Sequence, residues 1–158
     1  MNSEKILEFT RKVTISNRSE LVVIMYEILF TYLEDAKNAK VIDEREEFKN
    51  AIRLADKVIV ELEDSLNFSY ELASSLYSLY AYSREQLASA IMKYNLEGVE
   101  NATRVLNRLY KAFCEVSLQD TSKPLMENAQ QIVAGMTYGK YQINEELNTS
   151  DNLRGFYV

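Results

Sequence analysis

Residues Leu21 to Ala36, LVVIMYEILFTYLEDA, make up most of the first long helix that the sequence predicts. Their apolar side chains recur at the three- and four-residue spacing of one face of an α-helix. The members of this face are Leu21, Met25, Ile28, Leu29, Tyr32, Leu33 and Ala36. The helix is expected to begin near Ser16 or Asn17, which are both good N-cap residues, and Asn17 with Glu20 has the residue types of a capping box.

Three further stretches downstream have the same periodicity, and each follows a capping residue: Asp43, Ser69 or Asn95. The second helix has its stripe at Phe48, Ala51, Ile52, Ala55, Val58, Ile59, Leu62 and Leu66. The third, expected over 70–94, carries Ala73, Leu76, Tyr77, Tyr80, Leu87, Ala88 and Ile91. The fourth carries Val99, Ala102, Val105, Leu106, Leu109 and Phe113. Helices joined by short loops pack as antiparallel neighbours, so we predict an all-α fold, an antiparallel up-down four-helix bundle.

The two ends of the chain add shorter elements to this prediction. A helical segment is expected over 3–12, followed by an extended connector over 13–15, where three β-branched residues stand together. Pro after a capping residue predicts an additional C-terminal helix over 124–137. We expect one helical-bundle domain over residues 1–144 and a polar, flexible tail over 145–158.

The residues that most catalytic and metal sites need are missing from the sequence. The chain has no histidine, which removes the commonest general base and metal ligand and excludes the di-iron bundles built on Glu-x-x-His. The single cysteine, Cys114, is expected to be a structural thiol. We therefore predict no enzyme activity, no catalytic residue, no metal site and no cofactor. A carboxylate-bound metal enzyme is kept as a third hypothesis.

Charge and hydropathy narrow the range of partners. The formal net charge of −6 over 158 residues opposes binding to nucleic acid, because the basic residues are interleaved with acids. The longest apolar stretch, residues 21–26, is too short to span a bilayer, so no membrane insertion is expected. The absence of a signal-peptide pattern and the single cysteine indicate a cytoplasmic protein.

Tyrosine is unusually abundant, with eleven residues in a chain that has no tryptophan. A buried tyrosine needs a partner for its hydroxyl group and therefore favours the border between core and surface. The rings could simply seal the edges of the bundle, or they could line apolar grooves that bind a polypeptide. On the second interpretation we assign the groove to Leu66, Tyr70, Tyr77, Tyr80 and Tyr110.

The N-terminal segment carries Ile6, Leu7 and Phe9, yet it is too short to be a stable helix alone. Two interpretations remain open. The segment could be a strap that closes the bundle, or a plug that occupies a groove until a partner helix displaces it.

Several stretches together resemble the FliS flagellar secretion chaperones. The stretch 14–27 is similar to the opening helix of that family, with aliphatic residues leading into Tyr26-Glu27. The stretch 55–67 resembles the end of its second helix, and 76–82 with Leu87 and Ala90 resembles its third. The resemblance spans roughly residues 6–116. The sequence departs from the family pattern at Arg18-Ser19, Ala90-Ile91 and Phe113-Cys114, and it extends further beyond Pro124.

The resemblance implies a concrete function. Members of this family bind the disordered C-terminal helical segment of flagellin, prevent its premature polymerisation and deliver it to the flagellar type III export gate. It also implies that Ile6 and Phe9 belong to an N-terminal element that occupies the binding cleft. The free protein is expected to be a monomer or a weak homodimer. The alternative is a non-catalytic helical adaptor or a self-associating structural bundle.

Overall fold

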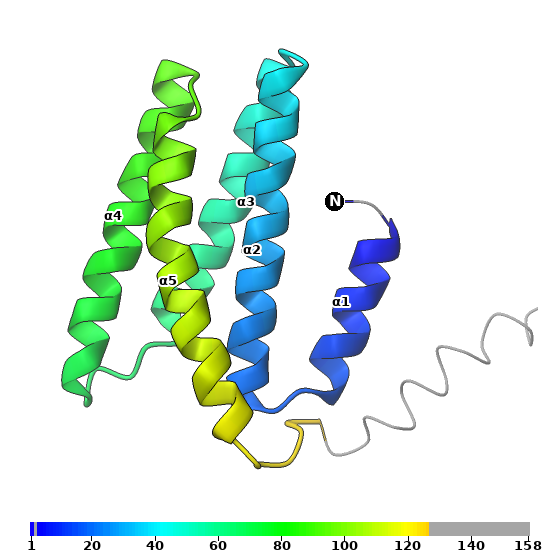
Figure 1. Ribbon diagram of the computed structural model, residues 1–158, viewed down its shortest axis with the longest axis vertical. Helices are drawn as coiled ribbons and strands as arrows, with labels where there is room; N and C mark the ends of the chain where they lie inside the picture. Colours follow the sequence, from blue (N-terminus) through cyan, green and yellow to red (C-terminus); the bar gives the residue numbers. More distant parts are fainter. Residues whose placement is uncertain (2, 127–158) are drawn as a thin grey trace, which may run out of the picture.

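The computed structural model describes residues 1 and 3–126, and its helices form a bundle with one helix outside it (Figure 1). In chain order the helices are α1 (Ser3–Ile15), α2 (Arg18–Val41), α3 (Arg45–Asp64), α4 (Glu71–Lys93) and α5 (Glu97–Gln119). Helices α2 to α5 run alternately up and down, and the main contacts join α2 to α3 and α5, and α4 to α3 and α5. Helix α1 packs against the outside of α2. The predicted all-α, up-down four-helix bundle is confirmed.

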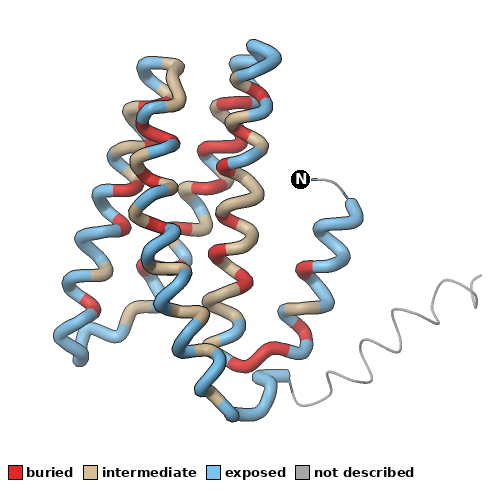
Figure 2. Tube along the Cα trace, viewed as in Figure 1, coloured by how far each residue is buried: buried red, intermediate tan, exposed pale blue. Residues whose placement is uncertain are grey.

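The core lies between the four long helices, where the buried positions gather (Figure 2). Helix α2 is covered from several sides, because α1, α3 and α5 all contact it. Its buried residues are Ile24, Tyr26, Leu29, Leu33, Ala36 and Ala39. The face predicted from the sequence includes three of these but not Tyr26, which is fully buried. A helix buried from several directions does not show a single apolar stripe.

The start of α2 matches its sequence prediction. The backbone N–H of Glu20 donates to the side chain of Asn17 over 2.9 Å, and the backbone N–H of Asn17 donates to the Glu20 carboxylate over 2.9 Å. This reciprocal pair is a capping box, and it satisfies two N–H groups that a helix start would otherwise leave unpaired.

The predicted caps of the next three helices were wrong by one residue each. The N-cap positions of α3, α4 and α5 are Glu44, Tyr70 and Leu96, and none of these side chains caps its helix. The predicted caps Asp43, Ser69 and Asn95 each lie one residue earlier. Asp43 instead takes a left-handed backbone conformation with φ of 57°, and Ser69 donates its hydroxyl to Asn67 over 2.6 Å. These turns are fixed by local hydrogen bonds and tertiary contacts, so the capping preference of a single residue did not locate them.

The predicted extended connector over 13–15 was also wrong, because α1 continues through Ile15. The hydroxyl of Thr14 donates to the carbonyl of Thr10 over 2.7 Å, and the Thr14 side chain is buried. The β-branched preference for extended backbone is only a weak bias, and tertiary burial overrides it here.

The turns at one end of the bundle are joined through Tyr94, the residue directly after α4. Its hydroxyl donates to the carboxylate of Asp43 over 2.8 Å. Its ring lies 3.6 Å from the ammonium of Lys40 and 4.3 Å from the guanidinium of Arg45, and it meets the Phe48 ring edge-on at 5.2 Å. The negative face of the ring attracts both cations. We call this group the Tyr94 clasp.

The segment that follows α5 returns to the junction between α1 and α2. The amide of Asn17 donates to the carbonyls of Asp120 and Ser122 over 3.3 and 3.4 Å, and the backbone N–H of Leu125 donates to the carbonyl of Ser16 over 3.1 Å. Residues 120–126 are irregular, so no helix begins at Pro124 as predicted. The rest of the predicted C-terminal helix and the boundary at residue 144 lie outside the described residues.

Candidate functional site

A pocket of about 260 Å³ opens where α3 ends and α4 begins. Tyr80 of α4 and Phe113 of α5 are among its lining residues. The other lining residues are Val22, Leu62, Ser65, Leu66, Asn67, Tyr70, Leu72, Ala73 and Leu76. We call this site the α3–α4 pocket. Most of these side chains are apolar, which suits an apolar ligand surface with a few polar groups at its margin.

Large apolar side chains stand exposed around the mouth of this pocket. Phe68, Tyr70 and Leu72 are 60%, 68% and 68% exposed, and Tyr77 is also exposed. The rings of Phe68 and Tyr77 pack edge-on with centroids 6.0 Å apart. We call Phe68, Tyr70, Leu72 and Tyr77 the apolar rim. An exposed apolar cluster beside a pocket marks a surface that binds another molecule, because water contact with so many apolar groups is unfavourable.

Beneath the pocket the core is aromatic and contains a buried pair of hydroxyl groups. The hydroxyl oxygens of Tyr26 and Tyr80 lie 2.7 Å apart. Burial raises the pKa of both phenols above their usual value, so both stay neutral. The Tyr26 ring lies 5.7 Å from Phe113 and 6.1 Å from Tyr110, and Tyr110 meets Phe30 edge-on at 5.5 Å. This aromatic cluster connects the α3–α4 pocket to the α2–α5 side of the bundle.

An ion-pair network lies between α3 and α4. Arg84 contacts the carboxylates of Asp56 and Glu63 over 2.8 and 3.0 Å, and these carboxylates raise the pKa of Arg84. Glu63 is only 9% exposed, and within residues 1 and 3–126 its Oε1 atom has no hydrogen-bond partner. A carboxylate in this setting depends on its arginine, because an unpaired buried charge is costly.

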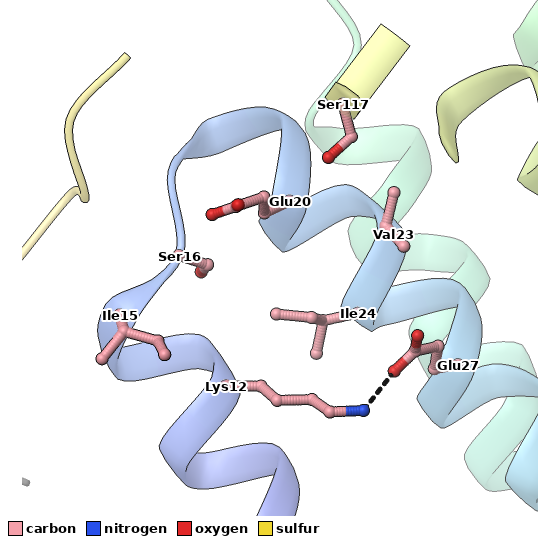
Figure 3. Close-up of a pocket in the computed structure, with 8 residues that line it drawn as sticks. All are labelled: Lys12, Ile15, Ser16, Glu20, Val23, Ile24, Glu27 and Ser117. Carbon is pink, nitrogen blue, oxygen red and sulfur yellow. Dashed lines mark hydrogen bonds and ion pairs between the residues drawn. The ribbon is translucent and has the colours of Figure 1, made fainter. Parts of the chain in front are cut away.

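A second hollow, of about 280 Å³, lies between α1 and α2 (Figure 3). Lys12 of α1 crosses its mouth and donates to the Glu27 carboxylate over 2.9 Å, and this hydrogen bond raises the pKa of Lys12. The other lining residues are Ile15, Ser16, Glu20, Val23, Ile24 and Ser117. We call this site the α1 groove.

Helix α1 is held in place by few contacts. Phe9 is its buried apolar residue, and the Lys12 ammonium lies 5.5 Å from the Phe9 ring. At its start the α-amino group of Met1 pairs with Asp35 over 2.7 Å. Because so little apolar surface is buried, α1 is the weakest-held helix that the structure describes.

The residues predicted to bind a partner fall into two groups. One group lies at the α3–α4 pocket and the other lies away from it. The first contains Leu66, Tyr70 and Tyr80, which line the pocket, and Tyr77, whose ring packs against Phe68. The second contains Ile6 and Phe9 of α1, and Tyr110 of α5, whose ring packs against Tyr26 and Phe30. Tyr80 is 1% exposed, so a dimer that buries the Tyr77 and Tyr80 face could not use the Tyr80 ring directly. The assignment of these residues to partner binding stays a prediction.

The sequence reasoning missed two members of the apolar rim, Phe68 and Leu72. Phe68 lies in the turn between α3 and α4, and Leu72 lies in the first turn of α4. Two large apolar residues in and beside a turn are a sequence pattern that indicates an exposed binding surface, because a turn has little core in which to bury them.

Neither a metal site nor a membrane span is present in the part of the chain that the structure describes. Across residues 1 and 3–126, no three carboxylate or thiol side chains are grouped so that they could bind a metal ion. None of the helices formed by these residues has the length and the apolar character needed to cross a bilayer.

Comparison with known families gives one match. A family model described as flagellar protein FliS matches residues 3–120, which is most of the chain. The match covers α1 to α5 and therefore both candidate sites. A search of curated proteins found no match. The chain belongs to the FliS family, whose general role is that of a non-catalytic flagellar export chaperone.

Proposed function

Since the chain is a FliS-family protein, we propose that it binds the disordered C-terminal helical region of flagellin in the cytoplasm. Bound in this way, flagellin cannot polymerise before export, and the complex delivers it to the flagellar type III export apparatus. The binding chemistry is that of an amphipathic helix laid into an apolar groove, where the ligand loses ordering entropy as it folds.

The apolar rim supports this proposal most strongly. Tyr70 and Leu72 are 68% exposed and line a pocket of about 260 Å³, and Phe68, the neighbour of the lining residue Asn67, is 60% exposed. Aromatic residues are enriched where interfaces gain most of their affinity, and hydroxyl groups such as that of Tyr70 tolerate the polar edge of a groove. An amphipathic flagellin helix would cover the rim with its apolar side chains.

The α1 groove supplies a second surface for the same ligand. Helix α1 lines one side of it through Lys12 and Ile15, and Lys12 forms an ion pair with Glu27 of α2. If α1 is a plug, a flagellin helix competes with it for Val23 and Ile24. Because α1 buries little apolar surface, displacing it costs little free energy.

Mixing the purified protein with a peptide of the flagellin C-terminal region tests the proposal. A one-to-one complex is expected in a sizing column with light-scattering detection. Leu72→Asp should weaken binding by about tenfold or more, because it places a charge in the apolar rim. Met92→Asp is the matched control, since Met92 is 86% exposed on the same helix but far from the rim, and it should bind normally.

The same experiment separates the alternative functions. A folded protein that binds no peptide would refute the proposal. A concentration-dependent dimer that Leu72→Asp dissolves, without any peptide binding, would support a self-associating bundle instead. Equal weakening by both variants would show that binding does not use the apolar rim.

A further inference from the structure

Another pocket, of about 340 Å³, lies between α3 and α4 on the side of the Tyr94 clasp. Ile52 and Leu87 form its floor, and each of them is only 1% exposed. Each helix also contributes one acid and one base to the walls, so apolar and charged groups stand close together, as in many ligand pockets. The remaining lining residues are Arg53, Asp56, Arg84, Glu85, Ala88 and Ile91. We call this site the Arg84 pocket.

The Arg84 pocket follows directly on the α3–α4 pocket. Tyr80 lines the α3–α4 pocket and Arg84, four residues later, lines the Arg84 pocket, so about 6 Å of α4 separates the two. Along α3 the order is reversed, because Asp56 lines the Arg84 pocket and Leu62, further along the chain, lines the α3–α4 pocket. The two pockets therefore lie one after the other along the same antiparallel pair of helices (Figure 1).

One side of α4 connects the apolar rim to the Arg84 pocket. Tyr77, Ala81, Arg84 and Ala88 are spaced four, three and four residues apart, so they share this side of the helix. Tyr77 belongs to the apolar rim, whereas Arg84 and Ala88 line the Arg84 pocket. Ala81 lies between them and is exposed, and its single methyl group leaves the way from one pocket to the other low.

Arg84 stands at the junction of the two pockets and is held there from α3. Its Nε and Nη1 atoms lie 2.8 Å and 3.0 Å from the carboxylates of Asp56 and Glu63, which fix the orientation of the guanidinium group. The Arg84 side chain is still 39% exposed. Arginine can pack its stem and its flat guanidinium group against apolar side chains while its hydrogen bonds stay in place. Arg84 can therefore form part of a binding surface that continues through both pockets.

We propose that one amphipathic helix of the partner occupies the α3–α4 pocket and the Arg84 pocket together, with Arg84 beneath its middle. This inference rests on the proposed function, because it extends the surface assigned there to flagellin. The lining residues of α4 run from Leu72 to Ile91, which is about 28 Å of helix, so the occupant is a helix of about 20 residues. Helices of this kind bind through apolar side chains repeated along one face.

The charges of the Arg84 pocket determine the flanks of the partner helix. Arg53 on α3 and Glu85 on α4 are exposed, and neither forms an ion pair with another residue of the described range, 1 and 3–126. A partner with an acid facing Arg53 and a base facing Glu85 complements both charges. The apolar rim carries no charge, so this pattern belongs to the end of the partner helix that lies in the Arg84 pocket.

Disulfide cross-linking tests whether one helix occupies both pockets. Leu72→Cys or Ala88→Cys is introduced into the full-length protein with Cys114→Ser, and a peptide of the flagellin C-terminal region is scanned with single cysteines. The two protein positions are about 24 Å apart along α4, which corresponds to about 16 residues of a partner helix. We expect the peptide positions that cross-link to the two cysteines to be separated by this number. Separations below about 12 or above about 20 residues, or cross-links from only one cysteine, would overturn the proposal.

Peptide affinity supplies a second measurement that needs no cysteine. Ala88→Asp should weaken binding of the same peptide by about tenfold, because it places a charge against the apolar stripe of the helix. Ser89→Asp is the matched control, since Ser89 is the next residue of α4 but lines neither pocket, and it should bind normally. Equal affinities of the two variants would contradict a helix in the Arg84 pocket.

The same titration separates this inference from the proposed function. A peptide that does not bind the unaltered protein refutes the proposed function and this inference with it. A peptide whose binding is weakened by Leu72→Asp but not by Ala88→Asp refutes this inference alone and leaves the α3–α4 pocket as the binding site.

Discussion

The hydroxyl oxygens of Tyr26 and Tyr80 lie 2.7 Å apart in the middle of the bundle and link α2 to α4 across the core. The helix pairs with direct neighbour packing are α2 with α3 and α5, and α4 with α3 and α5. The tyrosine pair therefore connects two helices diagonally opposed in the bundle, directly beneath the α3–α4 pocket.

The two hydroxyls of this pair should not contribute independently to the free energy of unfolding. Tyr26→Phe or Tyr80→Phe leaves the remaining hydroxyl buried without a partner and should lower the free energy of unfolding by about 1–2 kcal/mol. The double variant removes both polar groups and should lose less than the sum of the two single variants. Urea denaturation followed by circular dichroism measures all four proteins. Strict additivity would show that the two hydroxyls do not interact.

Glu63 should depend on Arg84. Arg84→Met leaves a carboxylate that is 9% exposed without its cation, and we expect a loss of about 2 kcal/mol. This is below the value for a fully buried pair because Arg84 is partly in contact with water. Lys49→Met removes a surface ion pair with Glu46 and is the control, whose urea midpoint should not change. A similar midpoint for both variants would show that Glu63 finds another partner.

The close crossing of α4 and α5 should not accept a side chain at Gly98. A Cβ atom at this position would collide with the carbonyl oxygen of Gln86 and crowd the Cβ of Ala90. Gly98→Ala should therefore destabilise the protein by about 2 kcal/mol, although alanine is the better helix former. Asn107→Ala on the exposed side of α5 should change stability by less than about 0.5 kcal/mol. A stabilised Gly98→Ala protein would contradict the observed helix spacing.

The attachment of the segment after α5 should weaken in acid. Hydrogen bonds from Ser122 and Ser19 lower the pKa of Asp120 to about 2. Because this pKa is below its usual 3.8, the stabilisation is present above about pH 4 and is lost as the pH falls toward 2. Carboxyl-carbon NMR titration should show the low value, and Ser19→Ala should raise it. Ser78→Ala, on another helix, should leave it unchanged.

Loosening α1 should expose the α1 groove. Phe9→Ser, or removal of residues 1–12, should increase binding of the dye ANS, because Val23 and Ile24 line the groove under this helix. Leu7→Ser is the control, since Leu7 is already exposed. Unchanged dye binding in the truncated protein would favour the strap interpretation over the plug.

The presence of the helices and their order along the chain could be predicted from the sequence, because apolar residues recur with a clear 3.6-residue period in α3 and α5. The helix starts were harder. Asn17 capped α2 as predicted, but Asp43 is drawn into the Tyr94 clasp, a contact across 51 residues that no local pattern contains. Burial of Tyr26 was missed for a similar reason, because a helix packed on several sides has no single stripe to display.

The candidate site was only partly predictable. Leu66, Tyr70 and Tyr80 do line one pocket, since spacing along α3 and α4 places them at the same end of the bundle. Tyr110 was grouped with them on composition, yet it packs against Phe30 on the α2–α5 side. Which helix faces meet is set by the packing of the whole bundle, and the periodicity of one helix does not contain that information.

Because of the Tyr94 clasp, the two ends of α4 differ in how they are held. The clasp fixes one end of the helix to the α2–α3 turn, whereas the far end, 23 residues away, carries the apolar rim. A rod of about 34 Å pivoting at one end by about 10° moves its free end by roughly 6 Å and its pivot hardly at all. An outward tilt of α4 about the clasp would therefore displace the helix most beside the pocket and least at the α2–α3 turn.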